Sequence, residues 1–195
     1  MNKHTLGLIV AGFFAAQTAI AACNDNDANY VTSSQGWVLQ KNTGLIWQPC
    51  LHGMTYENGS CTGTPTPANW QSALQTAQSN TDFQSSEWRI PNVKELASLL
   101  EFSCESRVNE AAFAGQPMNS TLWTSTVGAP LTGSTYSQGV VTVRFYDVVT
   151  PLTNSFTNSS YSYAPFITGQ TPTTTLNFRL VRNATPSDYF GLNSL

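Results

Sequence analysis

The chain changes its hydrophobic period once, and this change constrains its fold more than any other feature. In residues 64–78 and 92–101, apolar side chains recur at the spacing of a helix with one buried face. Further along, apolar and polar residues alternate in 122–127, 139–148 and 176–182, which is typical of strands. Two helices followed by antiparallel strands predict a single α+β domain.

Local signals indicate where the first elements begin. Two short apolar runs within 36–48 flank a turn that contains Asn and Gly, which predicts a β-hairpin. Thr66 and Pro67 have the character of a cap and a first-turn residue for the first helix. Asn92, with Glu95 three residues later, predicts a capping box at the start of the second helix.

The N-terminus has the pattern of a secretory signal peptide over residues 1–21. A polar start precedes a short apolar run, and Ala19 and Ala21 supply the small residues of a cleavage site. The alternative is a membrane anchor, but the apolar run is short for crossing a bilayer. We expect an exported protein with an N-terminal segment at 22–36, a domain at 37–183 and a flexible tail at 184–195.

The expected mature chain is mildly acidic. The signal contributes Lys3, one of the eight basic residues, so seven Lys and Arg remain against eleven Asp and Glu, a net charge of −4. This balance argues against nucleic acid or an anionic membrane surface as a partner. No long apolar run follows the signal, so we expect no membrane span.

Four cysteines follow the signal, and an even number in an exported chain predicts two disulfides, for which three pairings exist. Cys50 and Cys61 bracket a short polar loop and are expected to pair, which leaves Cys23 for Cys104. Cys23 has an alternative fate, because residues 20–23 also resemble a bacterial lipobox, in which this cysteine would carry a lipid anchor.

A long uncharged segment separates the strands near the C-terminus. Half of residues 148–177 are Ser, Thr or Asn, and aromatic residues are scattered among them. Because long loops on a rigid body commonly carry recognition, we expect Tyr161, Tyr163 and Phe166 to contact a ligand. These rings would stack on a sugar or anchor a protein partner.

The sequence offers little chemistry for catalysis or for metal binding. His52, the one histidine after the signal, is expected to be a solvated loop residue, and Glu95 and Glu101 are expected on the surface. Zinc-ligand spacing, phosphate loops and nucleophile elbows are absent from the sequence. The oxygen-rich run at 24–27 is a candidate for calcium but lacks the glycine and distant glutamate of an EF-hand, so we expect no cofactor.

Arg89, Arg144, Arg179 and Arg182 stand beside aromatic or branched residues at strand or helix edges. Two roles are open to them: a clamp for an anionic ligand, or bonds to carboxylates and backbone carbonyls inside the chain. The surrounding strand patterns favour the internal role.

Several motifs occur together in order along the chain. They are TGLIWQ at 43–48, WQSAL at 70–74, EWRIPNVKEL at 87–96, VN at 108–109 with Phe113 beyond, LWTST at 122–126 and FRLVR at 178–182. Together they resemble a known family, the bacterial extracellular domains named after the C-terminal domain of the Legionella collagen-like protein (Lcl). The resemblance covers about 37–183.

The resemblance implies two helices packed on a twisted antiparallel sheet with long loops, distantly similar to C-type-lectin-like and formylglycine-generating-enzyme folds. It also implies secretion and, in the name-giving member, a trimer that adheres to sulfated glycans. We expect the motif residues to form a structural core, with Trp88 packed between helices and sheet, Arg89 bonded to a carboxylate or carbonyls, and Pro91 setting the helix start. These residues are Trp47, Trp70, Trp88, Arg89, Pro91, Asn92, Trp123, Arg179 and Arg182.

The chain departs from the family pattern at informative places. Gln40 and Glu87 stand where the family often has Asp, and no collagen-like stalk precedes the domain, so trimerisation is not carried over. Seven basic residues make a poor patch for sulfated glycans. The calcium-binding triplets of C-type lectins, the paired redox cysteines and the iron-binding histidines of the enzyme branches are also absent from the sequence.

These observations favour a secreted or surface-exposed, non-catalytic binding module, an adhesin that recognises glycans or protein partners. The alternative is a structural or assembly component of an envelope, a pilus or a secreted complex. An enzyme is the third hypothesis. Oligomerisation is compatible with each of them.

Overall fold

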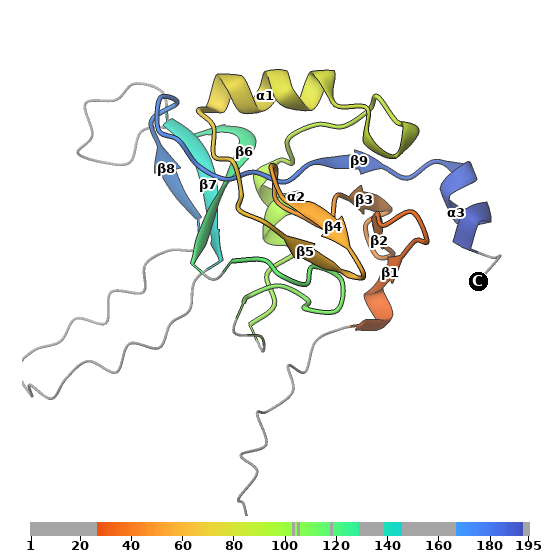
Figure 1. Ribbon diagram of the computed structural model, residues 1–195. Helices are drawn as coiled ribbons and strands as arrows, with labels where there is room; N and C mark the ends of the chain where they lie inside the picture. Colours follow the sequence, from red (N-terminus) through yellow and green to blue (C-terminus); the bar gives the residue numbers. More distant parts are fainter. Residues whose placement is uncertain are drawn as a thin grey trace, which may run out of the picture.

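The computed structural model consists of short antiparallel strands and a few helices (Figure 1). It describes residues 27–102, 104, 106–117, 119–128, 139–145 and 167–192. The α+β class is confirmed. No helix in these ranges is long and apolar enough to cross a membrane. Several sequence interpretations lie outside the described residues: the signal at 1–21, Cys23, residues 24–26 of the calcium candidate at 24–27, and Tyr161, Tyr163 and Phe166.

The described strands form three antiparallel sheets with the orders β1-β2-β3-β9, β4-β5 and β6-β7-β8. The helices are α1 (Trp70–Ser79), α2 (Val93–Ala97) and α3 (Pro186–Leu192), with short 3₁₀ turns η1 (Asp27–Asn29) and η2 (Asp82–Gln84). The strands are β1 (Tyr30–Thr32), β2 (Val38–Gln40), β3 (Leu45–Trp47), β4 (Thr55–Glu57), β5 (Ser60–Thr62), β6 (Ser120–Gly128), β7 (Gly139–Phe145), β8 (Ile167–Gln170) and β9 (Val181–Asn183).

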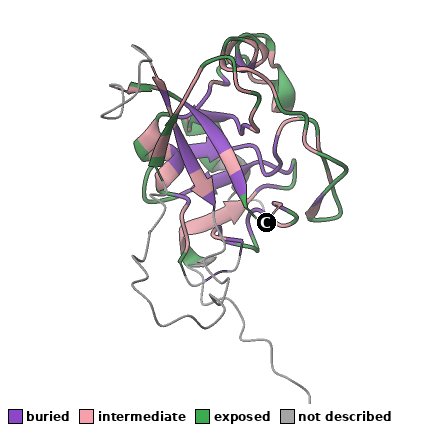
Figure 2. Cartoon of the chain, turned by 90° about the vertical axis from the view of Figure 1, so that its left-hand side faces the viewer, coloured by how far each residue is buried: buried purple, intermediate pink, exposed green. Residues whose placement is uncertain are grey.

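The four-stranded sheet separates two hydrophobic cores. Val38 and Trp47 point into one core, whereas Leu39 and Ile46, their neighbours along the strands, point into the other. Because successive side chains of a strand point to opposite faces, a sheet that is covered on both sides has continuous apolar strands. The predicted hairpin at 36–48 is therefore confirmed as the central pair β2–β3, and its strands are fully buried. Figure 2 shows buried residues, in purple, along strands in the interior of the chain.

Helix α1 covers the second core through Ala73 and Ala77. Its start differs from the prediction: the cap is Asn69, whose side chain accepts a hydrogen bond from the Ser72 N–H at 2.9 Å. Thr66 and Pro67 do not begin the helix, because Ala68 still forms a β-bridge with Leu176 and holds the chain extended.

Helix α2 covers the first core through Leu96. The predicted capping box between Asn92 and Glu95 is confirmed. The helix ends at Ala97, earlier than the pattern to residue 101 suggested. The Ser98 hydroxyl donates to the Glu95 carbonyl at 2.7 Å, and such side-chain bonds compete with helix continuation. Leu99 is nevertheless buried in the same core.

The strand predictions near the C-terminus were partly wrong. β7 begins at Gly139 as expected, and residues 146–148 lie outside the described part. β8 falls inside the segment expected to be loop, where it pairs with β7. Of the predicted strand at 176–182, only residues 181 and 182 belong to a ladder, as part of β9, since the residues before them bond to several separate segments.

Residues 176–183 form a central segment that crosses the middle of the fold (Figure 1). Its backbone bonds to five other parts of the chain. Phe178 and Leu180 pack into the second core, and Val181 packs into the first. The residues that bond to its backbone are Ala68, Trp123, His52, Gln48 and Arg89, and β3 pairs with its end.

The segment expected to be a flexible tail begins with helix α3. The Asp188 carboxylate accepts both Arg182 guanidinium N–H groups, at 2.7 and 2.8 Å, and the Thr185 N–H at 2.7 Å. Thr185 and Asp188 therefore cap the helix, with Pro186 at its first position. The sequence carried this signal, a threonine three residues before an acid.

We expect Asp188→Asn to lower the free energy of unfolding at pH 7 by about 1–2 kcal/mol. Bonds from Arg182 outweigh burial and lower the pKa of Asp188 from 3.8 to about 2. A lowered pKa of an acid adds stability above its unfolded value, and this stability is lost as the pH falls from about 4 towards 2. In urea unfolding, the free energies of unfolding of the variant and the wild type should therefore converge over that range.

Glu57→Gln, at an exposed position of β4, is the matched control. A difference in free energy between Asp188→Asn and the wild type that does not change with pH would contradict the prediction.

Candidate functional site

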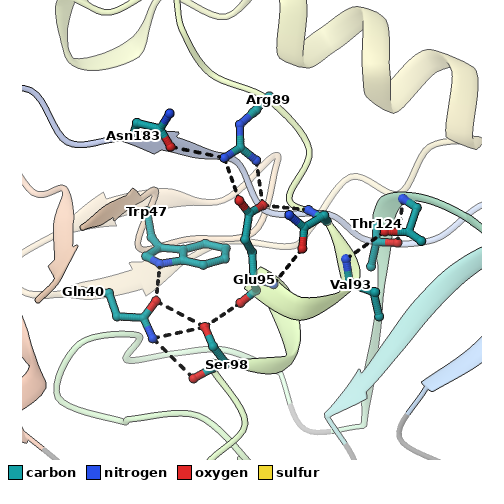
Figure 3. A network of polar contacts seen from close by, with 10 residues as sticks. Gln40, Trp47, Arg89, Val93, Glu95, Ser98, Thr124 and Asn183 are labelled. Carbon is teal, nitrogen blue, oxygen red and sulfur yellow. Dashed lines mark hydrogen bonds and ion pairs between the residues drawn. The ribbon is translucent and has the colours of Figure 1, made fainter. Parts of the chain in front are cut away.

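The WRIPN motif, residues 88–92, ties α2 to the surrounding sheets (Figure 3). The two terminal guanidinium nitrogens of Arg89 donate to the two carboxylate oxygens of Glu95 at 2.7 and 2.8 Å. The Pro91 carbonyl accepts the Ser125 N–H of β6 at 2.8 Å. Burial raises the pKa of Glu95, but the bonds from Arg89 and from the Asn92 backbone outweigh it, so the pKa lies below its usual value. Arg89 therefore has an internal partner.

Gln40 connects the central hairpin to α2 (Figure 3). Its amide oxygen accepts the Trp47 indole N–H at 3.1 Å, and its amide nitrogen donates to the Ser98 hydroxyl at 3.1 Å and carbonyl at 3.4 Å. A carboxylate could not donate to that carbonyl. The amide of Gln40 is therefore buried without a charge, and both its oxygen and its nitrogen are hydrogen-bonded.

Arg179 is buried in the first core. Its guanidinium donates to the carbonyls of Gln48 and Pro49 and, at 2.6 Å, to the Gln116 side chain, and it lies over the Phe113 ring at 4.5 Å. Burial lowers the pKa of Arg179 to about 9, and no carboxylate among the described residues pairs with it. This arginine is therefore a structural crosslink.

The other residues of the expected structural core differ in how far they are buried. Trp47, Trp88 and Trp123 are buried, Trp70 is half-buried, and Asn92 is exposed. The tryptophan indole N–H groups all find acceptors, as buried tryptophans usually do. Arg182 lies over the Trp88 ring at 5.4 Å and bonds to Asp188, and Arg144 is half-buried on β7.

A solvent-open hollow of about 310 Å³ lies between the start of the disulfide loop, β4 and η2, and we call it the His52 hollow. Sequence reasoning did not find it, because its walls come from segments far apart in the chain. A second hollow, of about 290 Å³, opens beside Arg89 and α1. The His52 hollow is lined by Gln35, Gln48, Pro49, Cys50, Leu51, His52, Gly53, Met54, Thr55, Tyr56, Asp82 and Phe83.

The predicted disulfide between Cys50 and Cys61 is confirmed, with 5.4 Å between the Cα atoms, and it ties the ends of the loop that forms one wall of the hollow. Cys104 is buried and disulfide-bonded. Its predicted partner, Cys23, lies outside the described residues, so that pairing and the lipid alternative stay predictions.

His52 lies in a turn, as the sequence suggested, but it is half-buried and not fully solvated. Its ring stacks on Phe178 at 4.5 Å between centroids, and its backbone N–H donates to the Phe178 carbonyl at 3.0 Å. Burial lowers the pKa of His52, and the charge of Asp82 offsets part of that effect. The lowered pKa favours the neutral form of the imidazole.

Asp82 is held in one orientation on the opposite wall. Its Oδ2 accepts hydrogen bonds from Gln48 at 2.9 Å and from Asn80 at 2.8 Å. The next two residues, Phe83 and Gln84, have φ angles of 55° and 58°, which are strained for side chains of this size. Such strain often accompanies binding sites.

A glycine brings the two aromatic residues of the hollow together. A Cβ added to Gly36 would meet the Tyr56 ring at 2.7 Å and lies 3.7 Å from Phe83. Gly36 also has a φ of 99°, which other residues rarely adopt. The aromatic side of the hollow therefore depends on a glycine at this position.

The described residues contain no group of three or more His, Cys, Asp or Glu side chains that could hold a metal ion. The His52 hollow combines one carboxylate, a histidine, amides and aromatic rings. This combination suits reversible binding of a ligand.

Comparison with family models places residues 36–182 in the Lcl C-terminal domain family. The match spans most of the chain and agrees with the resemblance carried by the motifs. Neither the curated proteins nor the solved structures gave a match.

We expect Glu95→Ala to lower the free energy of unfolding by about 1–3 kcal/mol, because it removes both the Arg89 ion pair and the acceptor for the Asn92 N–H. Glu95→Gln keeps an acceptor and should cost less. Lys94→Ala, on the exposed side of α2, is the control. If urea unfolding showed the same loss of free energy of unfolding for all three variants, the role of Glu95 as ion-pair partner and cap would be contradicted.

We expect the His52 ring to titrate below pH 6.5 in a proton NMR titration, because burial on Phe178 disfavours the charged form. Asp82→Asn should lower the midpoint further, because the carboxylate favours the imidazolium. A midpoint above pH 6.5 in the wild type would contradict the effect of burial. The same midpoint in Asp82→Asn would contradict the effect of the Asp82 charge on His52.

Proposed function

The chain belongs to the Lcl C-terminal domain family, and from this membership we propose that it is a secreted or surface-exposed, non-catalytic binding module. Its proposed role is that of an adhesin, which recognises glycans or a protein partner. Export by the signal at 1–21 and a C-type-lectin-like arrangement are part of this proposal. The family match over residues 36–182 carries it.

The use of the charged groups supports a non-catalytic role. Arg89, Arg179 and Arg182 bond to groups within the chain, and the carboxylates of Glu95 and Asp188 serve the same bonds. A catalytic site would require such groups to face a substrate. A rigid body with surface hollows is better suited to recognition.

A second candidate function is that of an assembly component. Val127 and Ile167 are exposed on β6 and β8, the outer strands of the three-stranded sheet. Exposed apolar residues on edge strands favour pairing with another chain. Co-purification in a complex of fixed stoichiometry would support this role, whereas a monomer that binds cells or glycans would favour the adhesin.

Replacing Tyr161, Tyr163 and Phe166 together with alanine tests the ligand contacts that the sequence predicts. If these rings contact the ligand, binding of the protein to cells, to a glycan array or to matrix proteins should fall at least about tenfold. The melting temperature should change by no more than about 2 °C. Unaltered binding by the variant would remove these residues from the site, and a wild type that binds none of the surfaces would count against the adhesin role.

A further inference from the structure

We propose that the His52 hollow binds an alkylammonium group, the lysine side chain of a partner protein. This proposal rests on the binding role above and names the chemistry of one of its ligands. It follows from four properties of the hollow: its charge, its hydrogen-bonding groups, its apolar walls and its size.

The hollow favours a cation. Asp82 contributes a carboxylate, whereas no Lys or Arg occurs among its lining residues. Its histidine lies on Phe178 and has a lowered pKa, so it adds no positive charge near neutral pH. A sulfated or phosphorylated ligand would meet a negative charge here and find no basic partner.

Two side chains of the hollow, Gln48 and Asp82, offer oxygens that can accept hydrogen bonds from a ligand. Gln48 uses its amide nitrogen to donate to Asn80 at 3.2 Å and to Asp82 at 2.9 Å, so its amide oxygen is the part that can take a further bond. The Asp82 Oδ1 accepts no hydrogen bond from the described residues. An ammonium group carries three donors and no acceptor, which matches such a lining.

Asp82 distinguishes lysine from arginine. Its Oδ2 already accepts two hydrogen bonds, from Gln48 and Asn80, so only Oδ1 remains for a ligand. A guanidinium gains most from a fork that engages both oxygens of a carboxylate, whereas an ammonium binds as a point charge.

The walls suit a chain of methylene groups. Leu51, Met54, Tyr56 and Phe83 line the hollow together with the polar groups. The lysine stem packs along apolar surface while its charged end reaches a polar partner, and aromatic rings attract the cation. The volume of about 310 Å³ is at the small end of the range for ligand sites and is large enough for one lysine side chain.

NMR titration of the whole isotope-labelled protein with Nα-acetyl-lysine amide tests the proposal. We expect millimolar affinity that weakens with added salt, and amide shifts at His52, Tyr56 and Phe83. Nα-acetyl-norleucine amide, which lacks the ammonium group, should bind at least about tenfold more weakly. Asp82→Asn should weaken the lysine probe at least about fivefold, because it removes the charge and retains an acceptor for Gln48 and Asn80.

Glu57→Gln is the matched control, since it removes one negative charge from β4 next to Tyr56 without belonging to the lining. It should bind the lysine probe like the wild type. Equal binding of the norleucine probe, unchanged binding by Asp82→Asn, or no shifts with the lysine probe would overturn the proposal.

Glucosamine and glucose form a second arm of the titration. Binding of glucosamine without binding of the lysine probe would assign the hollow to an amino sugar and overturn the protein partner. Because the probes are small molecules, these outcomes are independent of whether the whole protein adheres to cells or arrays.

Discussion

The central segment at 176–183 is the constraint on which the rest of the structure depends. Its backbone bonds to the segments around Ala68, Trp123, His52, Gln48 and Arg89, and its end pairs with β3. A buried backbone must satisfy its N–H and C=O groups, and here separate parts of the chain do so in turn. The segment thereby fixes where α1, the disulfide loop and the WRIPN motif stand. Its alternating side chains belong to the two cores on either side.

The buried and half-buried arginines reinforce this arrangement. Arg179 joins the central segment to the carbonyls before the disulfide loop, and Arg182 joins β9 to α3. Removing one partner of such a bond leaves a polar group unsatisfied, which costs more than the bond contributes. These charges therefore hold the body together.

The His52 hollow shows how this framework produces a candidate site. His52 bonds to the Phe178 carbonyl of the central segment, and the Trp88 indole bonds to the Asp82 carbonyl at 2.8 Å. The two walls are thus positioned by the same core that stabilises the fold. The unusual backbone at Gly36 and Phe83 then brings aromatic rings to one place.

The sequence by itself determined the α+β class, the family, the β2–β3 hairpin, the capping box at Asn92 and the Cys50–Cys61 pair, because each depends on residues close together in the chain or on a motif. Only the tertiary structure decided the multiple pairing of the central segment and the stacking of His52 on Phe178. These features join residues far apart in the chain. Periodicity and capping signals describe local preference, whereas long-range hydrogen bonds and the sharing of two cores are settled when the whole chain packs.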